Sequence, residues 1–126
     1  RLINQKKPDL LCAAPMTQPT LRRRGFNQSA FIARLVSRGI GIPLRLTLLK
    51  KVRDTDQQST LSAKQRRKNL ADAFYCKHRL NGSHIALIDD ILTTGATANE
   101  ISKTLKAAGA ARVDIWVCAR TGDPSN

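Results

Sequence analysis

The segment Ile85–Thr97, with the sequence IALIDDILTTGAT, constrains the fold of this chain more than any other. Its apolar run predicts a buried strand that ends in two adjacent carboxylates, Asp89 and Asp90. A loop of small residues, 93–97, follows directly. This order predicts acidic side chains at the carboxyl end of a strand, with backbone N–H groups close by. A phosphorylated sugar needs such a layout, because oxygens accept from its hydroxyls or hold a cation while N–H groups bind its phosphate.

The residues after this loop predict a helix and a second strand. Thr97 and Glu100 form a capping-box pattern, which predicts that the helix starts at Thr97. Apolar residues then recur on one face until Gly109, which is a typical stop. Arg112–Ala119 has the composition of a strand. A strand–loop–helix–strand unit of this length favours a right-handed parallel crossover, so the predicted fold class is α/β with a mainly parallel β-sheet flanked by helices.

Three alternatives to a sugar-phosphate site fit the Ile85–Thr97 pattern less well. Ordinary strand-to-helix turns also favour Thr and Gly, but they account poorly for the paired acids. A P-loop needs Lys after its last glycine, whereas Gly95 is followed by Ala96. A response-regulator receiver carries its paired acids near its start and a phospho-acceptor Asp well downstream, which this sequence does not reach. We therefore favour a site for a phosphorylated sugar.

The rest of the chain supplies further expected elements. In chain order they are a strand at Asp9–Ala14, a loop at Met16–Arg24, a helix from Asn27 to Gly39 or Gly41, a strand at Leu44–Lys51, a polar loop at Val52–Ser62, a basic helix at Ser62–Leu70 and a hairpin turn around Asn81-Gly82. Alternating leucines indicate the second strand, and Asn27 is a good N-cap. The polar loop suggests a mobile lid, although a plain surface connection fits its composition equally well.

Two further motifs, outside the acidic segment, indicate to which protein family the chain is similar. They are RRGFNQ at 23–28, and an R-x-T-x-x-Q stretch formed by Arg53, Thr55 and Gln58 with a later R-x-N at Arg67 and Asn69. The acidic segment resembles the phosphoribosyl-pyrophosphate (PRPP) motif of type I phosphoribosyltransferases. Together these motifs resemble the ComF/GntX family, in the correct order over nearly the whole chain. Members of that family usually begin with a cysteine-rich, zinc-ribbon-like segment, and here the chain opens at Arg1 without one, so we expect a fragment of a longer protein.

This resemblance implies a type I phosphoribosyltransferase fold that binds PRPP with Mg²⁺, and a role in natural competence or the handling of imported DNA. It implies that Asp89 and Asp90 are catalytic, holding the ribose hydroxyls and, directly or through water, the Mg²⁺ ion. The other implied site residues are Thr93, Thr94, Gly95, Ala96 and Thr97 for the 5-phosphate, Arg23 and Arg24 for pyrophosphate, and Arg53, Gln58 and Arg67 for the lid. No segment is long enough to assign as a nucleobase-binding hood, so the acceptor substrate stays unassigned.

Charge is distributed unevenly along the chain. Through Arg79 there are eighteen Lys or Arg against four acids, a balance of +14, while from Leu80 onward four against five give −1, which together reproduce the net charge of +13. A positive field would attract anionic PRPP, but one small ligand does not need so many cations. Single-stranded DNA would use them better, although the aromatic residues on which its bases stack are few. A basic surface with no partner is the third possibility. The rival to an enzyme is thus a non-catalytic, PRPP-responsive protein that binds single-stranded DNA.

Length and composition fit one small domain in the cytoplasm. A chain of 126 residues can bury one core but not two. No apolar run approaches the roughly 20 residues that a membrane helix needs, and no signal-peptide pattern is present. Cys12, Cys76 and Cys118 are widely spaced and are expected to be reduced thiols rather than metal ligands. His78 and His84 are expected to have surface or turn roles, and the oligomeric state is left open.

Overall fold

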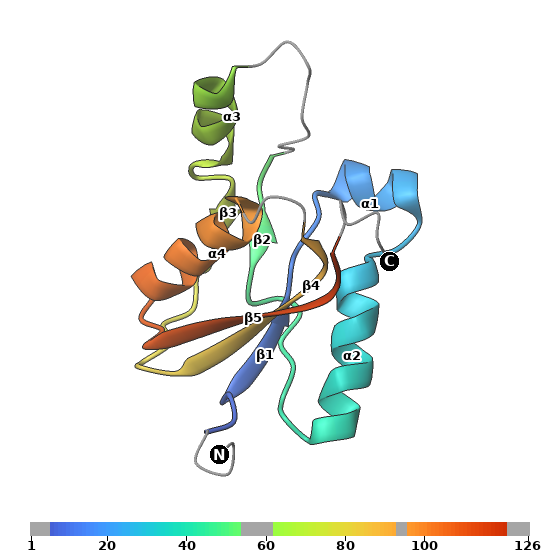
Figure 1. Cartoon of the computed structure of the whole chain (residues 1–126), viewed down its shortest axis with the longest axis vertical. Helices are drawn as coiled ribbons and strands as arrows, with labels where there is room; N and C mark the ends of the chain where they lie inside the picture. Colours follow the sequence, from blue (N-terminus) through green and yellow to red (C-terminus); the bar gives the residue numbers. More distant parts are fainter. Residues whose placement is uncertain (1–5, 54–61, 93–95, 121–126) are drawn as a thin grey trace.

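A three-stranded parallel sheet lies at the centre of the chain in the computed structural model, which describes residues 6–53, 62–92 and 96–120 (Figure 1). The strands are β1 (Leu10–Ala13), β4 (His84–Leu92) and β5 (Arg112–Arg120), in the spatial order β1-β4-β5. Both strand pairs are parallel. The predicted α/β class with a mainly parallel sheet is therefore confirmed.

Helices cover both faces of this sheet. Figure 1 shows α2 (Gln28–Ile40) on one side of the strands and α4 (Ala96–Ala107) on the other. The four residues 85–88 of β4 are each 0 or 1% exposed. Alternate side chains point to opposite faces, so a strand covered on both sides needs an apolar residue at every position. Packing of the two helices thus explains the unbroken apolar run that precedes Asp89.

The predicted strand at Leu44–Lys51 is wrong as a continuous element. Leu44 forms an isolated parallel bridge with Leu11 of β1, and the chain then turns, with the Leu48 N–H donating to the Arg45 carbonyl at 3.4 Å. Only β2 (Lys50–Lys51) is extended, and it pairs antiparallel with β3 (Phe74–Tyr75). Leu48 and its neighbour Leu49 are both buried, which an alternating strand with one exposed face does not allow. The turn lets both leucines enter the core.

The predicted loop at Met16–Arg24 is also wrong, because most of it forms the helix α1 (Gln18–Arg24). Thr17 is the N-cap and accepts a hydrogen bond from the Thr20 N–H at 3.4 Å, while Pro19 occupies the first turn. Gly25 ends the helix at a φ of 93° and donates to the Leu21 carbonyl at 2.8 Å. Thr followed by an early Pro is a helix-start signal. Pro is excluded from helix interiors but not from first turns, so Pro19 is compatible with this helix.

One helix start follows its predicted cap, a second has a cap that was not predicted, and a third differs from its prediction. Asn27 caps α2, with its side-chain oxygen accepting from the Ala30 N–H at 3.2 Å. Ser62 and Gln65 cap α3 (Ala63–Leu70) reciprocally, at 3.1 and 2.9 Å. Thr97 lies inside the first turn of α4, which begins at Ala96, so the predicted start at Thr97 is one residue late.

The turn at Asn81-Gly82 is present, but the predicted hairpin is wrong. Both residues have positive φ, 49° and 79°. The strands on either side do not pair with each other, since β3 pairs with β2 while β4 pairs with β1 and β5. Instead the Gly82 N–H donates to the Gly109 carbonyl at 2.8 Å. The turn therefore fastens the start of β4 to the connection between α4 and β5.

Candidate functional site

Asp89 lies in the carboxyl-terminal part of β4, three residues before the strand ends at Leu92, and is 8% exposed. The prediction that this strand ends at its two acids is therefore wrong, because pairing with β5 continues through Leu92. Asp89 follows the fully buried run 85–88, so packing of that run fixes where the carboxylate lies. The Ala14 N–H donates to the Ile88 carbonyl at 3.0 Å, which brings the end of β1 beside the end of β4. In parallel sheets the loops that leave adjacent carboxyl ends converge and form ligand sites. The end of β1 therefore lies beside the part of β4 that carries the buried carboxylate.

The predicted 5-phosphate loop is described only in part. Thr93, Thr94 and Gly95 lie outside the described residues, whereas Ala96 and Thr97 form the first turn of α4. The helix thus begins four residues after β4 ends, with Ala96 exposed and Thr97 half-buried. The first N–H groups of a helix lack intrahelical partners and favour anions. Asp90 lies within β4, but its side chain is outside the description.

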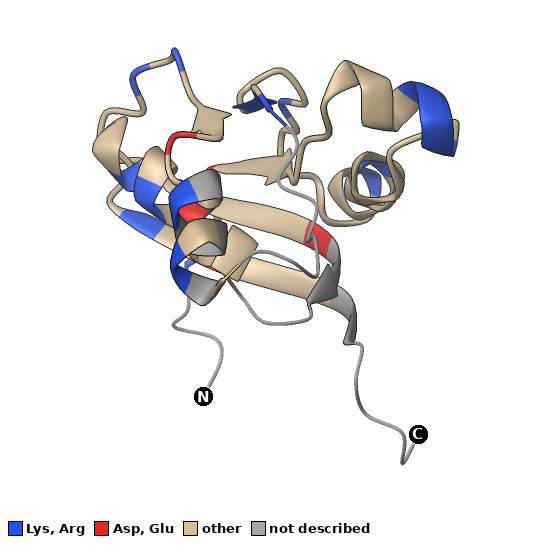
Figure 2. Cartoon of the chain, turned by 90° about the horizontal axis from the view of Figure 1, so that it is seen from above, with Lys and Arg blue, Asp and Glu red and all other residues tan. Residues whose placement is uncertain are grey.

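The predicted pyrophosphate ligands, Arg23 and Arg24, lie in the last turn of α1 and are exposed. Positive side chains at the carboxyl end of a helix are favoured by its dipole. Figure 2 shows this basic turn at the outer end of α1, away from the strands. The start of α2 lies close to the end of β1, because the Asn27 side-chain amide donates to the Ala14 carbonyl at 3.0 Å. The pyrophosphate assignment stays a prediction.

The predicted lid at 52–62 is described only at its two ends. Val52 donates to the Ala73 carbonyl at 2.7 Å, and the exposed Arg53 guanidinium donates to the Ala71 carbonyl. Gln58 lies outside the described residues, and Arg67 lies on α3 with its side chain outside the description. The first end of the segment is therefore fixed to the chain before β3, and the lid function stays a prediction.

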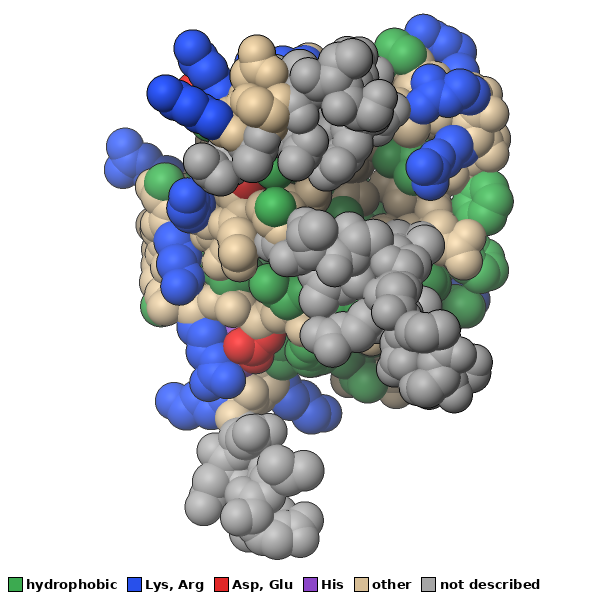
Figure 3. All heavy atoms as spheres, turned by 45° about the horizontal axis from the view of Figure 1, so that its top comes forward, with side chains coloured by type: hydrophobic (Ala, Val, Ile, Leu, Met, Phe, Trp, Pro, Cys, Tyr) green, Lys and Arg blue, Asp and Glu red, His purple; other side chains and the backbone are tan. Residues whose placement is uncertain are grey.

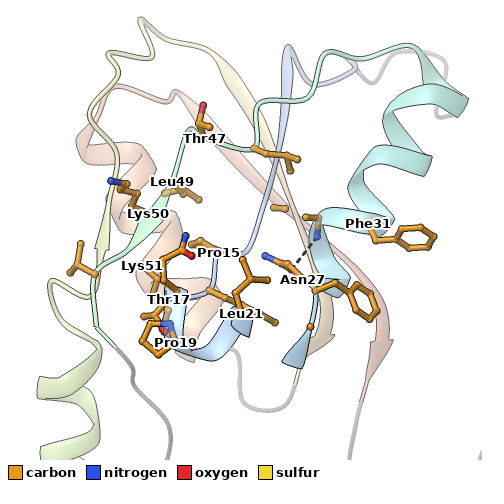
Figure 4. Close-up of a pocket in the computed structure, with 18 of the residues that line it drawn as sticks. Pro15, Thr17, Pro19, Leu21, Asn27, Phe31, Thr47, Leu49, Lys50 and Lys51 are labelled. Carbon is orange, nitrogen blue, oxygen red and sulfur yellow. Dashed lines mark hydrogen bonds between the residues drawn. The ribbon is translucent and has the colours of Figure 1, made fainter. Parts of the chain in front are cut away.

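A large groove next to these segments was not foreseen from the sequence. Its volume is about 960 Å³, and it lies between α1, the start of α2 and the chain that leads into β2 (Figure 4). Pro15, Thr17 and Leu21 line one side, and Leu49 and Lys51 line the other. These residues are far apart in the sequence and share no motif. Gly25, Phe26 and Asn27 of the RRGFNQ motif also line the groove, but the motif does not indicate which distant segment forms the opposite wall.

Titratable groups elsewhere have structural roles. Burial, and then the neighbouring Cys76, raise the pKa of Cys12 to about 12, so this thiol stays protonated and is no nucleophile. At the amino ends of the strands, Asp114 contacts His84 Nε2 at 2.8 Å and accepts from Arg112 Nε at 3.0 Å. Partial burial raises the pKa of Asp114, but these hydrogen bonds and charges outweigh it, and the pKa is lowered overall.

The match to a family profile decides the identity of the fold. The description "Phosphoribosyl transferase domain" applies to residues 22–124 of the chain. The chain belongs to the phosphoribosyltransferase family. Similar solved structures agree with this assignment at the level of the fold. They include a purine phosphoribosyltransferase from Pyrococcus horikoshii, with a TM-score of 0.57, 18% identity and coverage of 90% of this chain and 62% of that chain. A hypoxanthine phosphoribosyltransferase from Staphylococcus aureus has a TM-score of 0.58 and 17% identity, and the match covers 98% of this chain and 57% of that chain.

Curated relatives place the chain among ComF-like members of this phosphoribosyltransferase family. It is 38% identical over 118 residues to Competence protein F of Haemophilus influenzae, covering 91% of this chain and 52% of the relative. It is 37% identical over 114 residues to DNA utilization protein YhgH of Escherichia coli K12, and this match covers 90% of this chain and 50% of the relative. The chain spans about half the length of these relatives. The ComF/GntX resemblance drawn from the sequence is confirmed.

Proposed function

We propose that this phosphoribosyltransferase domain binds PRPP together with Mg²⁺ at the carboxyl ends of β1 and β4. The observation that carries the proposal is the buried Asp89 in the carboxyl-terminal part of β4, the strand that precedes α4 in the chain. The acids and the helix start together match the two ends of a sugar phosphate. Membership of the phosphoribosyltransferase family supports the same ligand class.

The chemistry of the donors suits a magnesium ion held mainly by the substrate. Mg²⁺ prefers oxygen ligands and is usually bound by one or two carboxylates together with substrate phosphates and waters. Asp89 and Asp90 would supply such carboxylates. Among the described residues, no group of three or more His, Cys, Asp or Glu side chains could hold a metal ion. A cage made only of protein ligands is therefore not what we propose. When bound, Mg²⁺ would neutralise charge on the departing pyrophosphate.

The roles proposed for the remaining residues are those that the family resemblance implies. Residues 93–97, including the first turn of α4, would bind the 5-phosphate through N–H and hydroxyl donors. Arg23 and Arg24 would bind pyrophosphate, and the segment with Arg53, Gln58 and Arg67 would close over the sugar. Substitution at the anomeric carbon with pyrophosphate as leaving group depends on such electrostatic stabilisation more than on a strong general acid.

Titration calorimetry with PRPP, with and without Mg²⁺, tests the binding proposal. We expect saturable binding that weakens when EDTA removes the metal, and absence of binding in both conditions would refute the proposal. Release of pyrophosphate from PRPP in the presence of a panel of nucleobases then separates an enzyme from a module that only binds.

Cysteines 12 and 76 are free thiols in the structure, which agrees with the reducing cytoplasm that we propose as the location. No helix in the described ranges is long and apolar enough to cross a membrane.

A second candidate function is the binding of single-stranded DNA by a PRPP-responsive, non-catalytic protein. Two observations favour it: the basic surplus before Leu80, and the names of the relatives, which refer to competence and to DNA utilization. Figure 3 shows Lys and Arg side chains on two flanks of one face of the molecule. Distributed cations bind a phosphate backbone with little dependence on sequence. A role in natural competence or the handling of imported DNA would fit either function.

A further inference from the structure

Exposed apolar side chains of the described residues gather in one stretch of the chain. Six large hydrophobic residues are at least 38% exposed, and all but Tyr75 lie between positions 26 and 52; they are Phe26, Phe31, Leu35, Ile40 and Val52. Phe31 and Leu35 share one stripe of α2 with two exposed arginines, at 34 and 38. Single exposed apolar residues are normal, but a contiguous set marks an interaction surface.

The groove described above adjoins this stripe and has mostly apolar walls. Met16, Pro19, Leu46 and Leu49 contribute to them, and the rim carries Phe26, Phe31 and Val52. Figure 4 shows that the walls come from separate elements, with Leu21 on α1 facing the chain around Leu49 and Phe31 projecting outward from α2. The centre of a protein interface is enriched in aromatic residues and Met, and apolar grooves accept the apolar face of a helix.

The charge around the groove has one sign. Between Leu10 and Arg53 the chain holds nine cationic residues and no Asp or Glu. Three of these cations, Arg34, Lys50 and Lys51, line the groove itself, and no carboxylate does so among the described residues. A second copy of this chain would bring the same positive charge to the contact, and like charges oppose association. A partner with negative charge is favoured instead.

We propose that this groove binds an acidic, amphipathic helical segment of another protein. Apolar side chains of the segment at positions i, i+3, i+4 and i+7 would enter the groove, and its acidic residues would meet Arg34, Lys50 and Lys51 at the rim. Nucleic acid fits less well, because the walls are mainly aliphatic and the two rim rings already contact each other edge-to-face, with centroids 6.4 Å apart. The proposal does not depend on PRPP binding.

Peptide selection tests which chemistry the groove prefers. Random peptides of about 16 residues, long enough for roughly four helical turns, are displayed and selected on the whole chain. The double variant Phe31→Ser/Val52→Ser serves for counter-selection, since both side chains are more than half exposed and their loss should leave the fold intact. We expect enriched peptides to be acidic and to repeat apolar residues at helical spacing. Enrichment of basic or patternless peptides, or none that depends on the groove, would overturn the proposal.

Binding of a synthetic copy of the enriched peptide is then measured by fluorescence anisotropy. The groove variant should weaken binding at least about tenfold, or about 1.4 kcal/mol, and Arg34→Glu/Lys50→Glu should do the same. The matched controls are Tyr75→Ser, which removes an equally exposed ring outside the groove, and Lys77→Glu/Lys106→Glu. Both controls should bind within about twofold of the parent, well under the cost of losing an interface hot spot. Equal losses in variants and controls would refute the site.

Two further measurements separate the other occupants of the groove. Sedimentation velocity shows whether Phe31→Ser/Val52→Ser dissociates a dimer of the parent chain, which would assign the groove to a second copy and overturn the proposal. Competition by a single-stranded oligonucleotide that depends on the same two residues would assign it to nucleic acid and overturn it as well. Asp89→Asn/Asp90→Asn should bind the peptide as the parent does, so a failure of the proposed PRPP site would leave this result unchanged.

Discussion

The two ends of the parallel sheet use aspartate in different ways. At the amino end, Asp114 bridges His84 and Arg112, and Asp9 accepts from the His84 N–H at 2.8 Å. Toward the carboxyl end, Asp89 is buried within β4, three residues before the strand ends at Leu92. Carboxylates at the amino end join one strand to the next, whereas Asp89 lies toward the end of the sheet at which parallel α/β folds bind their ligands. The same residue type therefore stabilises the sheet at one end and is proposed to bind PRPP at the other.

The largest expected effect is a loss of Mg-PRPP affinity when the two aspartates toward the carboxyl end of the sheet are replaced. Asp89→Asn with Asp90→Asn should lower the affinity for Mg-PRPP at least about 100-fold, roughly 2.7 kcal/mol, because neutral amides neither hold the metal nor accept as strongly from ribose hydroxyls. The fold should survive, since both substitutions keep the side-chain shape. Calorimetry measures the affinity and circular dichroism the melting temperature. Affinity equal to that of the parent would remove these residues from the site.

The next prediction concerns single-stranded DNA binding, which we expect to depend on the basic first part of the chain and not on the acidic segment Ile85–Thr97. Replacing Arg66, Arg67 and Lys68 by Ala should reduce the salt dependence of single-stranded DNA binding, by up to about 0.7 in slope for each lost phosphate contact. Because Arg67 is itself proposed to close over the sugar, this variant should also weaken Mg-PRPP binding, whereas Arg66→Ala with Lys68→Ala should leave that binding unchanged. Fluorescence anisotropy over a salt series measures the slope. A parent chain that binds no oligonucleotide at about 50 mM salt would return the function to a small-molecule enzyme.

A smaller effect isolates the amino end of the sheet. Asp114→Asn should destabilise the fold by about 1 kcal/mol at pH 7, the scale of a partly exposed charged hydrogen bond. The pKa of Asp114 is lowered from its ordinary 3.8 in the folded state. Its stabilising contribution is thus complete above the ordinary value and is lost as the pH falls through the folded pKa. Urea unfolding of both proteins should show a difference that shrinks below pH 4, with unchanged PRPP affinity. A difference that grows in acid would contradict this.

The smallest expected effect comes from an exposed ion pair on α4, which serves as a reference for the stability contributed by Asp114. Lys103 pairs with Glu100 on α4 at 3.8 Å, but the lysine side chain is 76% exposed. Lys103→Ala should change the free energy of unfolding by less than about 0.5 kcal/mol, as solvent screens such pairs. The same urea titration provides the value. A loss as large as that of Asp114→Asn would mean that the bridge at the end of the sheet has no special role.

Local patterns in the sequence were enough for the elements around the proposed site. The apolar run before Asp89 and the Asn27 cap each encode their structure within a few residues, so the central strand and α2 were predicted, and the motifs identified the ComF-like family. α1 was also encoded locally, by Thr17 and Pro19, but the signal was interpreted as a loop. Of the predicted site residues, Gln58, residues 93–95 and the side chains of Asp90 and Arg67 lie outside the description, so their roles stay predictions.

Tertiary contacts alone decided the rest. The alternating leucines at 44–48 predicted a strand, yet the bridge from Leu44 to Leu11 and burial of both Leu48 and Leu49 turn the chain instead. The hairpin expected at Asn81-Gly82 does not form, because β3 pairs with β2 while β4 pairs with β1 and β5. The groove combines α1, α2 and the approach to β2. Periodicity reports which residues will be buried, but the partner that buries them is chosen by packing between segments distant in sequence, and no local pattern encodes that choice.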